Sequence, residues 1–149
     1  MDIKELRIGN YVKDMDYDYV TIAGIHPEST NELTVCINDC DVGDRLFKDV
    51  EGIPLTEEWL LKFGFEYLSK ERGGLIVFAD WNKDYKSYLH VDIKNKRMYL
   101  MDFKTKHFNG MNPSTAICLM CSKTPLMAHQ LQNLFFALTG KELTIKETA

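Results

Sequence analysis

The sequence predicts an α+β protein made mainly of antiparallel sheet, with an SH3-like curled N-terminal sheet, one short central helix and one longer C-terminal helix. Short runs of β-branched and aromatic residues, separated by turn residues, fill most of the chain before the last helix. Helix-start and helix-stop signals enclose only two segments. With 149 residues, 45% of them hydrophobic, the chain can bury one core. We therefore expect a single domain over 1–149, which could be subdivided into an N-terminal β subdomain (1–52) and an α+β remainder (53–149).

The first fifty residues favour a small sheet of four short strands. Apolar residues around Gly9 and the run 19–25 flank the polar segment 13–18, which is typical of a hairpin. Two more strands are expected at 32–37 and 45–50. Short antiparallel strands in such a series curl into SH3-like barrels.

A short helix is expected in the middle of the chain. Thr56 can cap it, Glu57 and Glu58 lie in the first turn, where the helix dipole favours acids, and Gly64 would end it. A tight hairpin at 94–96 joins two of the strands that follow. These strands are expected at 65–68, 74–81, 87–93, 97–103 and 116–121.

The last helix has strong end signals. Thr124 followed by Pro125 is typical of a helix start, and Gly140 is typical of a helix stop. One apolar face is predicted to lie in the core, formed by Met127, Leu131, Leu134, Phe135 and Leu138. The opposite face is uncharged, so either the chain itself covers it or a partner docks there. This outer face holds Leu126, His129, Asn133 and Phe136.

Charge is distributed unevenly along the chain. The net charge is −4, and residues 1–50 hold 11 acids against 5 bases, an excess that would repel nucleic acid. From Phe108 to Gly140, Lys123 is the single charged residue, so that segment must be mostly buried. No apolar run is long enough to span a bilayer, and no secretion signal begins the chain. We therefore expect a soluble cytoplasmic protein without a membrane partner.

Two acidic loops are candidate partner-binding sites. The first begins like a calcium loop, but Tyr19 stands where an EF-hand needs glycine and Ile25 where it needs glutamate, so an EF-hand is excluded. Besides simple solvation, such loops could imitate phosphate and occupy a basic groove on a nucleic-acid enzyme. The candidates are Asp14, Asp16 and Asp18 in the first loop and Asp39, Asp41 and Asp44 in the second.

The segment 81–107 offers an alternative function. Bases alternate there with aromatic residues, which are the components of a platform for stacking nucleic-acid bases. No RNA- or DNA-binding motif accompanies them. The residues that would bind nucleic acid are Trp81, Lys83, Lys86, Lys94, Lys96 and Arg97.

Four cysteines have a spacing that fits a zinc site on paper. A zinc knuckle needs tight turns at each pair, whereas the run 116–121 has strand character and no glycine. We therefore expect no metal, no cofactor and reduced thiols at Cys36, Cys40, Cys118 and Cys121. The sequence also lacks paired metal-binding histidines, a phosphate-binding glycine loop and a G-x-S-x-G motif. A cysteine paired with a distant histidine stays open as the basis of a cryptic enzyme.

Three segments resemble a family of small uncharacterised proteins of bacteria and their phages or prophages. They are residues 5–12, 53–58 and 129–143, the last reading HQLQNLFFALTGKEL. The family has no assigned activity, so the resemblance implies an origin in mobile elements and no catalytic residue.

These observations favour a non-enzymatic protein that binds another protein. The acidic loops and the family context suggest a phage-encoded inhibitor of a host defence nuclease, in the manner of an anti-CRISPR protein. A nucleic-acid-binding module and a cryptic enzyme are the alternatives. A protein partner is expected, and a homodimer is compatible with the uncharged helix face.

Overall fold

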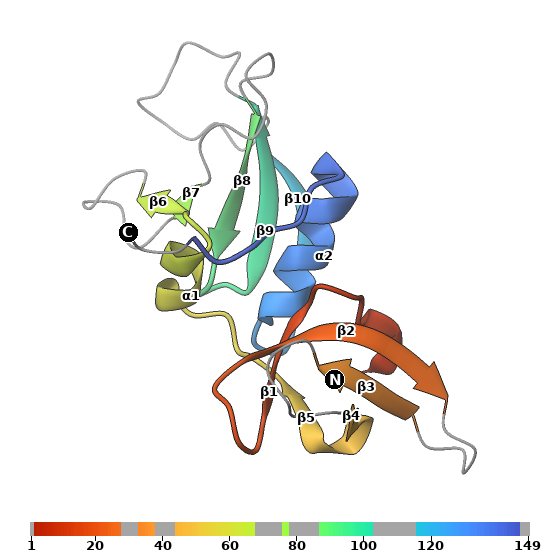
Figure 1. Cartoon of the computed structure of the whole chain (residues 1–149). Coiled ribbons are helices and arrows are strands. Elements are labelled where there is room, and N and C mark those ends of the chain that lie inside the picture. Colours follow the sequence, from red (N-terminus) through yellow and green to blue (C-terminus); the bar gives the residue numbers. More distant parts are fainter. Residues whose placement is uncertain are drawn as a thin grey trace. The chain divides into compact units, whose positions relative to one another are not determined.

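The computed structural model describes residues 2–27, 33–37, 44–67, 76–77, 87–102 and 116–146. It confirms an α+β fold of antiparallel sheets, with two α-helices among these residues (Figure 1). The chain forms two compact units. Unit 1 contains Met1–Pro54 and Met127–Leu143, and unit 2 contains Leu55–Leu126 and Thr144–Ala149. The single domain and its subdivision near residue 52 stay predictions.

The described residues of unit 1 form an antiparallel sheet of five strands in the order β4-β3-β2-β1-β5. A 3-10 helix, η1 (Ile3–Glu5), precedes it. The strands are β1 (Tyr11–Asp14), β2 (Val20–Pro27), β3 (Leu33–Ile37), β4 (Asp44–Leu46) and β5 (Val50–Gly52).

The predicted continuous strand at 45–50 is wrong. A second 3-10 helix, η2 (Phe47–Asp49), divides it into β4 and β5. The reason is the pairing: β4 pairs with β3 and β5 pairs with β1, so the chain must cross between the two edges of the sheet.

The long strand β2 links the two parts of this sheet. Its first residues pair with β1, and its residues from Ile22 onward pair with β3, with a register shift between Ile22 and Gly24. Bulges of this kind bend a strand and increase its twist. The SH3-like curl of the whole sheet stays a prediction. The buried apolar cluster of this unit consists of Leu6, Val12, Val20, Ile22 and Val50.

Unit 2 begins with the predicted short helix, α1 (Glu57–Lys62). The Thr56 hydroxyl accepts the Trp59 N–H at 3.3 Å, which confirms the predicted cap. Gly64 follows the helix with a φ of +81°, a conformation that favours glycine. A side chain there would also collide with Lys146, whose backbone N–H donates to the Lys62 carbonyl at 2.8 Å.

The sheet of unit 2 has the order β10-β9-β8-β7-β6. The predicted tight hairpin is confirmed, since Asp92 pairs with Arg97 across the turn and Lys96 adopts a positive φ. Leu89, Val91 and Met98 on this hairpin are fully buried. The strands are β6 (Glu66–Tyr67), β7 (Ile76–Val77), β8 (Ser87–Asp92), β9 (Arg97–Asp102) and β10 (Ala116–Cys121).

The last helix, α2 (Ala128–Thr139), belongs to unit 1. It ends at Gly140 (φ +69°), as predicted, but the predicted start at Thr124 and Pro125 is wrong. Met127 is extended and pairs with Pro54 in an isolated β-bridge, and the Ala128 N–H donates to the Ile53 carbonyl at 2.9 Å. These strand-like contacts hold the backbone extended up to Met127.

The predicted core face of α2 is confirmed in part. Leu131 and Phe135 are buried, whereas Met127, Leu134 and Leu138 are partly buried. Within the described ranges, no helix is both long and apolar enough to cross a bilayer.

Candidate functional site

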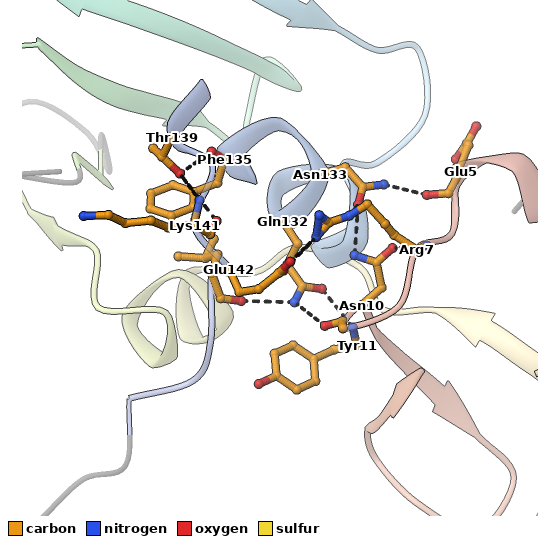
Figure 2. Close-up of polar contacts among 12 residues, drawn as sticks. Glu5, Arg7, Asn10, Tyr11, Gln132, Asn133, Phe135, Thr139, Lys141 and Glu142 are labelled. Carbon is orange, nitrogen blue, oxygen red and sulfur yellow. Dashed lines mark hydrogen bonds and ion pairs between the residues drawn. The ribbon is translucent and has the colours of Figure 1, made fainter. Parts of the chain in front are cut away.

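The outer face of α2 is covered in large part by unit 1 itself. Gln132 is fully buried there, and its Oε1 accepts the Tyr11 N–H at 2.8 Å (Figure 2). Its Nε2 donates to the carbonyls of Gly9 at 3.0 Å and Leu143 at 3.1 Å. One side chain therefore ties the helix to the start of β1 and to the segment that follows the helix.

Asn133 continues this polar network toward the N-terminal segment. Its Nδ2 donates to the Glu5 carbonyl, and its Oδ1 accepts from Asn10 at 3.0 Å and Arg7 at 3.3 Å (Figure 2). Arg7 also binds the Glu142 carboxylate through two hydrogen bonds of 2.8 and 2.7 Å. The amide of Asn133 is thus used within the fold.

His129 lies on the same face and is fully buried. Its Nε2 is 3.3 Å from the Glu5 Oε2, and its Nδ1 has no hydrogen-bond partner. Burial lowers the pKa of His129, against the opposing effect of the hydrogen bond and charge of Glu5. A neutral ring that donates from Nε2 fits this site. A Cβ added at Gly52 would lie 3.3 Å from the ring, so the imidazole is closely packed.

The two remaining residues of the predicted face differ. Leu126 is buried. Phe136 is 39% exposed, and the Arg7 guanidinium lies 4.0 Å from its ring centroid. His129 and Asn133 of the predicted docking face are therefore used within unit 1, Leu126 belongs to unit 2, and Phe136 is the exposed member of the face.

The turn between β1 and β2 has a different character. We call residues 14–19 the acidic tip. Asp14 is only 3% exposed, and its Oδ1 accepts the backbone N–H groups of Asp16 and Tyr17, each at 2.8 Å. The Asp14 N–H donates to the Tyr17 carbonyl at 3.3 Å. Asp14, predicted as a partner-binding residue, instead holds the turn in shape.

The rest of the acidic tip is exposed to solvent. Asp16 and Asp18 are exposed, and their role in binding a partner stays a prediction. Met15 is 82% exposed, and Tyr17 and Tyr19 are exposed as well. Sequence reasoning missed these three large side chains, although the alternation Met-Asp-Tyr-Asp-Tyr within a polar turn was a visible signal.

Tyr19 is held in place by a neighbouring ring. Tyr11 and Tyr19 pack edge to face, with ring centroids 5.7 Å apart and an interplanar angle of 89°. The acidic tip therefore presents carboxylates and aromatic groups on a turn that is fixed at both ends.

The second predicted acidic loop lies mostly outside the described residues. Asp39 and Asp41 are outside them. The backbone of Asp44 begins β4 opposite Cys36, and its side chain is not described.

The basic hairpin is described over residues 87–102, which include both of its strands and the turn. Trp81, Lys83 and Lys86 lie outside the described residues. Lys94 and Arg97 are exposed, whereas the Lys96 Nζ donates to the Lys123 carbonyl at 2.9 Å. Among the aromatic residues of this segment, Tyr99 stacks on His90 with centroids 5.6 Å apart.

The described cysteine side chains are those of Cys118 and Cys121, which are free and exposed. Cys40 lies outside the described residues, and the Cys36 side chain is not described. Among the residues that the structure describes, no three histidine, cysteine or acidic side chains gather into a metal site.

Comparison with protein-family models, with curated proteins and with solved structures gives no match for this chain. The resemblance to small phage and bacterial proteins therefore stays a prediction.

Proposed function

We propose that this chain binds another protein through its acidic tip, as a phage- or prophage-encoded inhibitor of a host defence nuclease of the RNA-guided kind. The observation that carries the proposal is Asp14, a buried carboxylate that fixes the turn so that the neighbouring side chains face solvent.

The exposed side chains of the acidic tip match the composition of protein interfaces. Tyrosine and methionine are enriched in interface cores, because they bury much apolar area. Met15, Tyr17 and Tyr19 supply such groups within five residues. The tip therefore supports a protein partner better than a small-molecule ligand.

The charge of the tip indicates what kind of surface it fits. Asp16 and Asp18 alternate with the apolar residues, so a basic groove with apolar walls would complement both. Nucleases carry such grooves, because they bind phosphates. An acidic tip in that groove would compete with the nucleic-acid substrate.

The fixed shape of the tip also favours binding. A loop that is already ordered loses less conformational entropy when it binds. The backbone hydrogen bonds to Asp14 and the edge-to-face contact of Tyr19 supply this order.

A nucleic-acid-binding function has one observation in its favour, the exposed Lys94 within the β8-β9 turn and the exposed Arg97 directly after it. The engagement of Lys96 and Tyr99 within the fold counts against a stacking platform there. Two of the three described histidines, His90 and His129, are buried and His26 is exposed, so the described residues give the enzyme hypothesis little support.

The proposal is tested by measuring target-DNA cleavage by a panel of purified RNA-guided nucleases at increasing concentrations of this protein. Inhibition by the parent should be lost in Asp16→Lys/Asp18→Lys. The matched control is Asp49→Lys/Glu66→Lys, which reverses two other exposed acids. Each substitution changes the charge by two, so both variants bring the net charge from −4 to 0.

Equal inhibition by both double variants would show that the acidic tip is not the binding site. No inhibition by the parent of any nuclease in the panel would remove the inhibitor proposal. Anisotropy of a labelled single-stranded oligonucleotide, with Lys94→Glu/Arg97→Glu as the variant, would then test the nucleic-acid alternative.

A further inference from the structure

Strand β10 forms one edge of the sheet of unit 2. Among the described residues it pairs with β9 alone, and it stands last in the order β10-β9-β8-β7-β6. An edge strand presents backbone N–H and C=O groups that can pair with a further strand. The occupant that such an edge favours is an extended chain.

The other edge strands of the described fold carry the usual protection against such pairing. Strands β4, β5 and β6 have only two or three residues each. Each also contains charge: Asp44 and Arg45 in β4, Glu51 in β5, and Glu66 in β6. Short length and charged residues are two ways in which proteins prevent edge-to-edge pairing.

Strand β10 has neither protection. Its six residues, Ala-Ile-Cys-Leu-Met-Cys, include no charge and no proline. Ile117 is 62% exposed, Cys118 and Cys121 are exposed, and Leu119 and Met120 are only partly buried. An apolar edge of this length is the kind that associates with another strand.

We infer that β10 pairs antiparallel with β10 of a second copy, so that two unit 2 sheets join across a two-fold axis. The strand is self-complementary, because an uncharged strand placed against itself brings no like charges together. A second copy also offers no better described edge, since β4, β5 and β6 are shorter and charged. The inference does not depend on the proposed function.

The register shift in β10 limits how strong this pairing can be. The pairing with β9 slips between Cys118 and Met120, so Leu119 forms a bulge. Bulges shorten the regular part of an edge and twist it. We therefore expect a reversible dimer, with a dissociation constant in roughly the micromolar range.

The test is sedimentation velocity of the full chain over a wide range of concentrations, in the presence of a reductant so that thiol oxidation plays no part. The parent should shift from monomer to dimer as concentration rises. Ile117→Lys should raise the dissociation constant by roughly tenfold or more, because it places a charge at the edge of each copy.

The matched control is Leu61→Lys. Leu61 is 46% exposed on α1 of the same unit, so the substitution has the same chemistry at a site away from β10. Thermal melting of each variant checks that it folds. The control should dimerise as the parent does.

Three results would overturn the inference. They are a parent that stays monomeric at every concentration, an Ile117→Lys variant that dimerises like the parent, and a Leu61→Lys control that loses the dimer. A monomeric parent that instead protects Cys118 and Cys121 from alkylation when an extended peptide is added would assign the edge to another protein.

Discussion

His129 has the unusual combination of full burial, a carboxylate on one ring nitrogen and no partner on the other. Burial lowers its pKa below the ordinary 6.5, with Glu5 opposing the shift. The folded state therefore prefers the neutral ring, whereas the unfolded chain takes up a proton near pH 6.5. His90 has a lowered pKa for the same first reason, burial, with Asp92 opposing.

We expect the free energy of unfolding to fall as the pH drops below 6.5. The reason is proton uptake by the two rings on unfolding. Their stabilising contribution is fully present above the pKa of histidine in the unfolded chain, and it is lost as the pH falls through their lower pKa in the folded state. Urea unfolding of His90→Gln/His129→Gln should depend less on pH than that of the parent between about pH 7.5 and 5.5, above the titration of ordinary carboxylates. Equal pH dependence of the two would show that these rings do not titrate on unfolding.

At the scale of the element, helix α2 is held to unit 1 by polar contacts as well as apolar packing. Gln132 bonds to two residues that lie more than 120 positions earlier in the chain, Gly9 and Tyr11. Removing its amide would leave one N–H and two carbonyls without their partner, and unmade hydrogen bonds of buried groups are costly.

Gln132→Leu should therefore destabilise the protein by about 2–4 kcal/mol. The control is Gln130→Leu on the same helix, which loses the single 3.1 Å hydrogen bond from the Met127 N–H and should cost about 1 kcal/mol. Urea denaturation measures both. Similar losses in the two variants would mean that the Gln132 contacts contribute little to holding the helix.

The bounds of the helices and strands show which structural features local sequence signals can predict. Local signals predicted α1 with its Thr56 cap, the stop at Gly140 and the bounds of β10. The start of α2 was mispredicted, because the pairing of Met127 with the distant Pro54 overrides the local preference of Thr124 and Pro125.

In the candidate site, too, some features could be predicted from local sequence and others depend on contacts between distant residues. The role of Asp14 is local, since its carboxylate bonds the N–H groups two and three residues later, and an Asx turn could have been predicted. The burial of His129 and Gln132 could not, because it depends on contacts with the N-terminal segment that only the fold brings near. The outer face of α2 was correctly described as uncharged. That property alone could not distinguish a face covered by the chain itself from a face that docks a partner.

At the scale of the whole molecule, the two proposed associations depend on different kinds of interaction and involve different units. The acidic tip of unit 1 would bind through charge together with aromatic contacts, whereas the β10 edge of unit 2 holds no charge at all. Salt separates these cases, because the Debye length falls from about 10 Å at 0.1 M to about 3 Å at 1 M.

Association of the parent with its nuclease partner should therefore slow as the sodium chloride concentration rises from 0.05 to 0.5 M, about one to two decades of rate being the usual range for steered encounters. The rate for Asp16→Lys/Asp18→Lys should be low and nearly independent of salt. Biolayer interferometry gives these rates. If the charge that steers association lies in the acidic tip, the control Asp49→Lys/Glu66→Lys should keep much of the parent's dependence of association rate on salt.

Dimerisation through β10 should respond differently in the same buffers. Salt does not screen backbone hydrogen bonds or apolar contacts. The dissociation constant of the parent dimer, measured by sedimentation velocity, should therefore stay constant or fall slightly as the salt concentration rises. Ile117→Lys should weaken the dimer without changing the salt slope of partner binding, whereas Asp16→Lys/Asp18→Lys should remove that slope and leave the dimer unchanged. If either variant moved both readouts, one surface would be serving both associations, and the assignment of separate roles to the two units would be wrong.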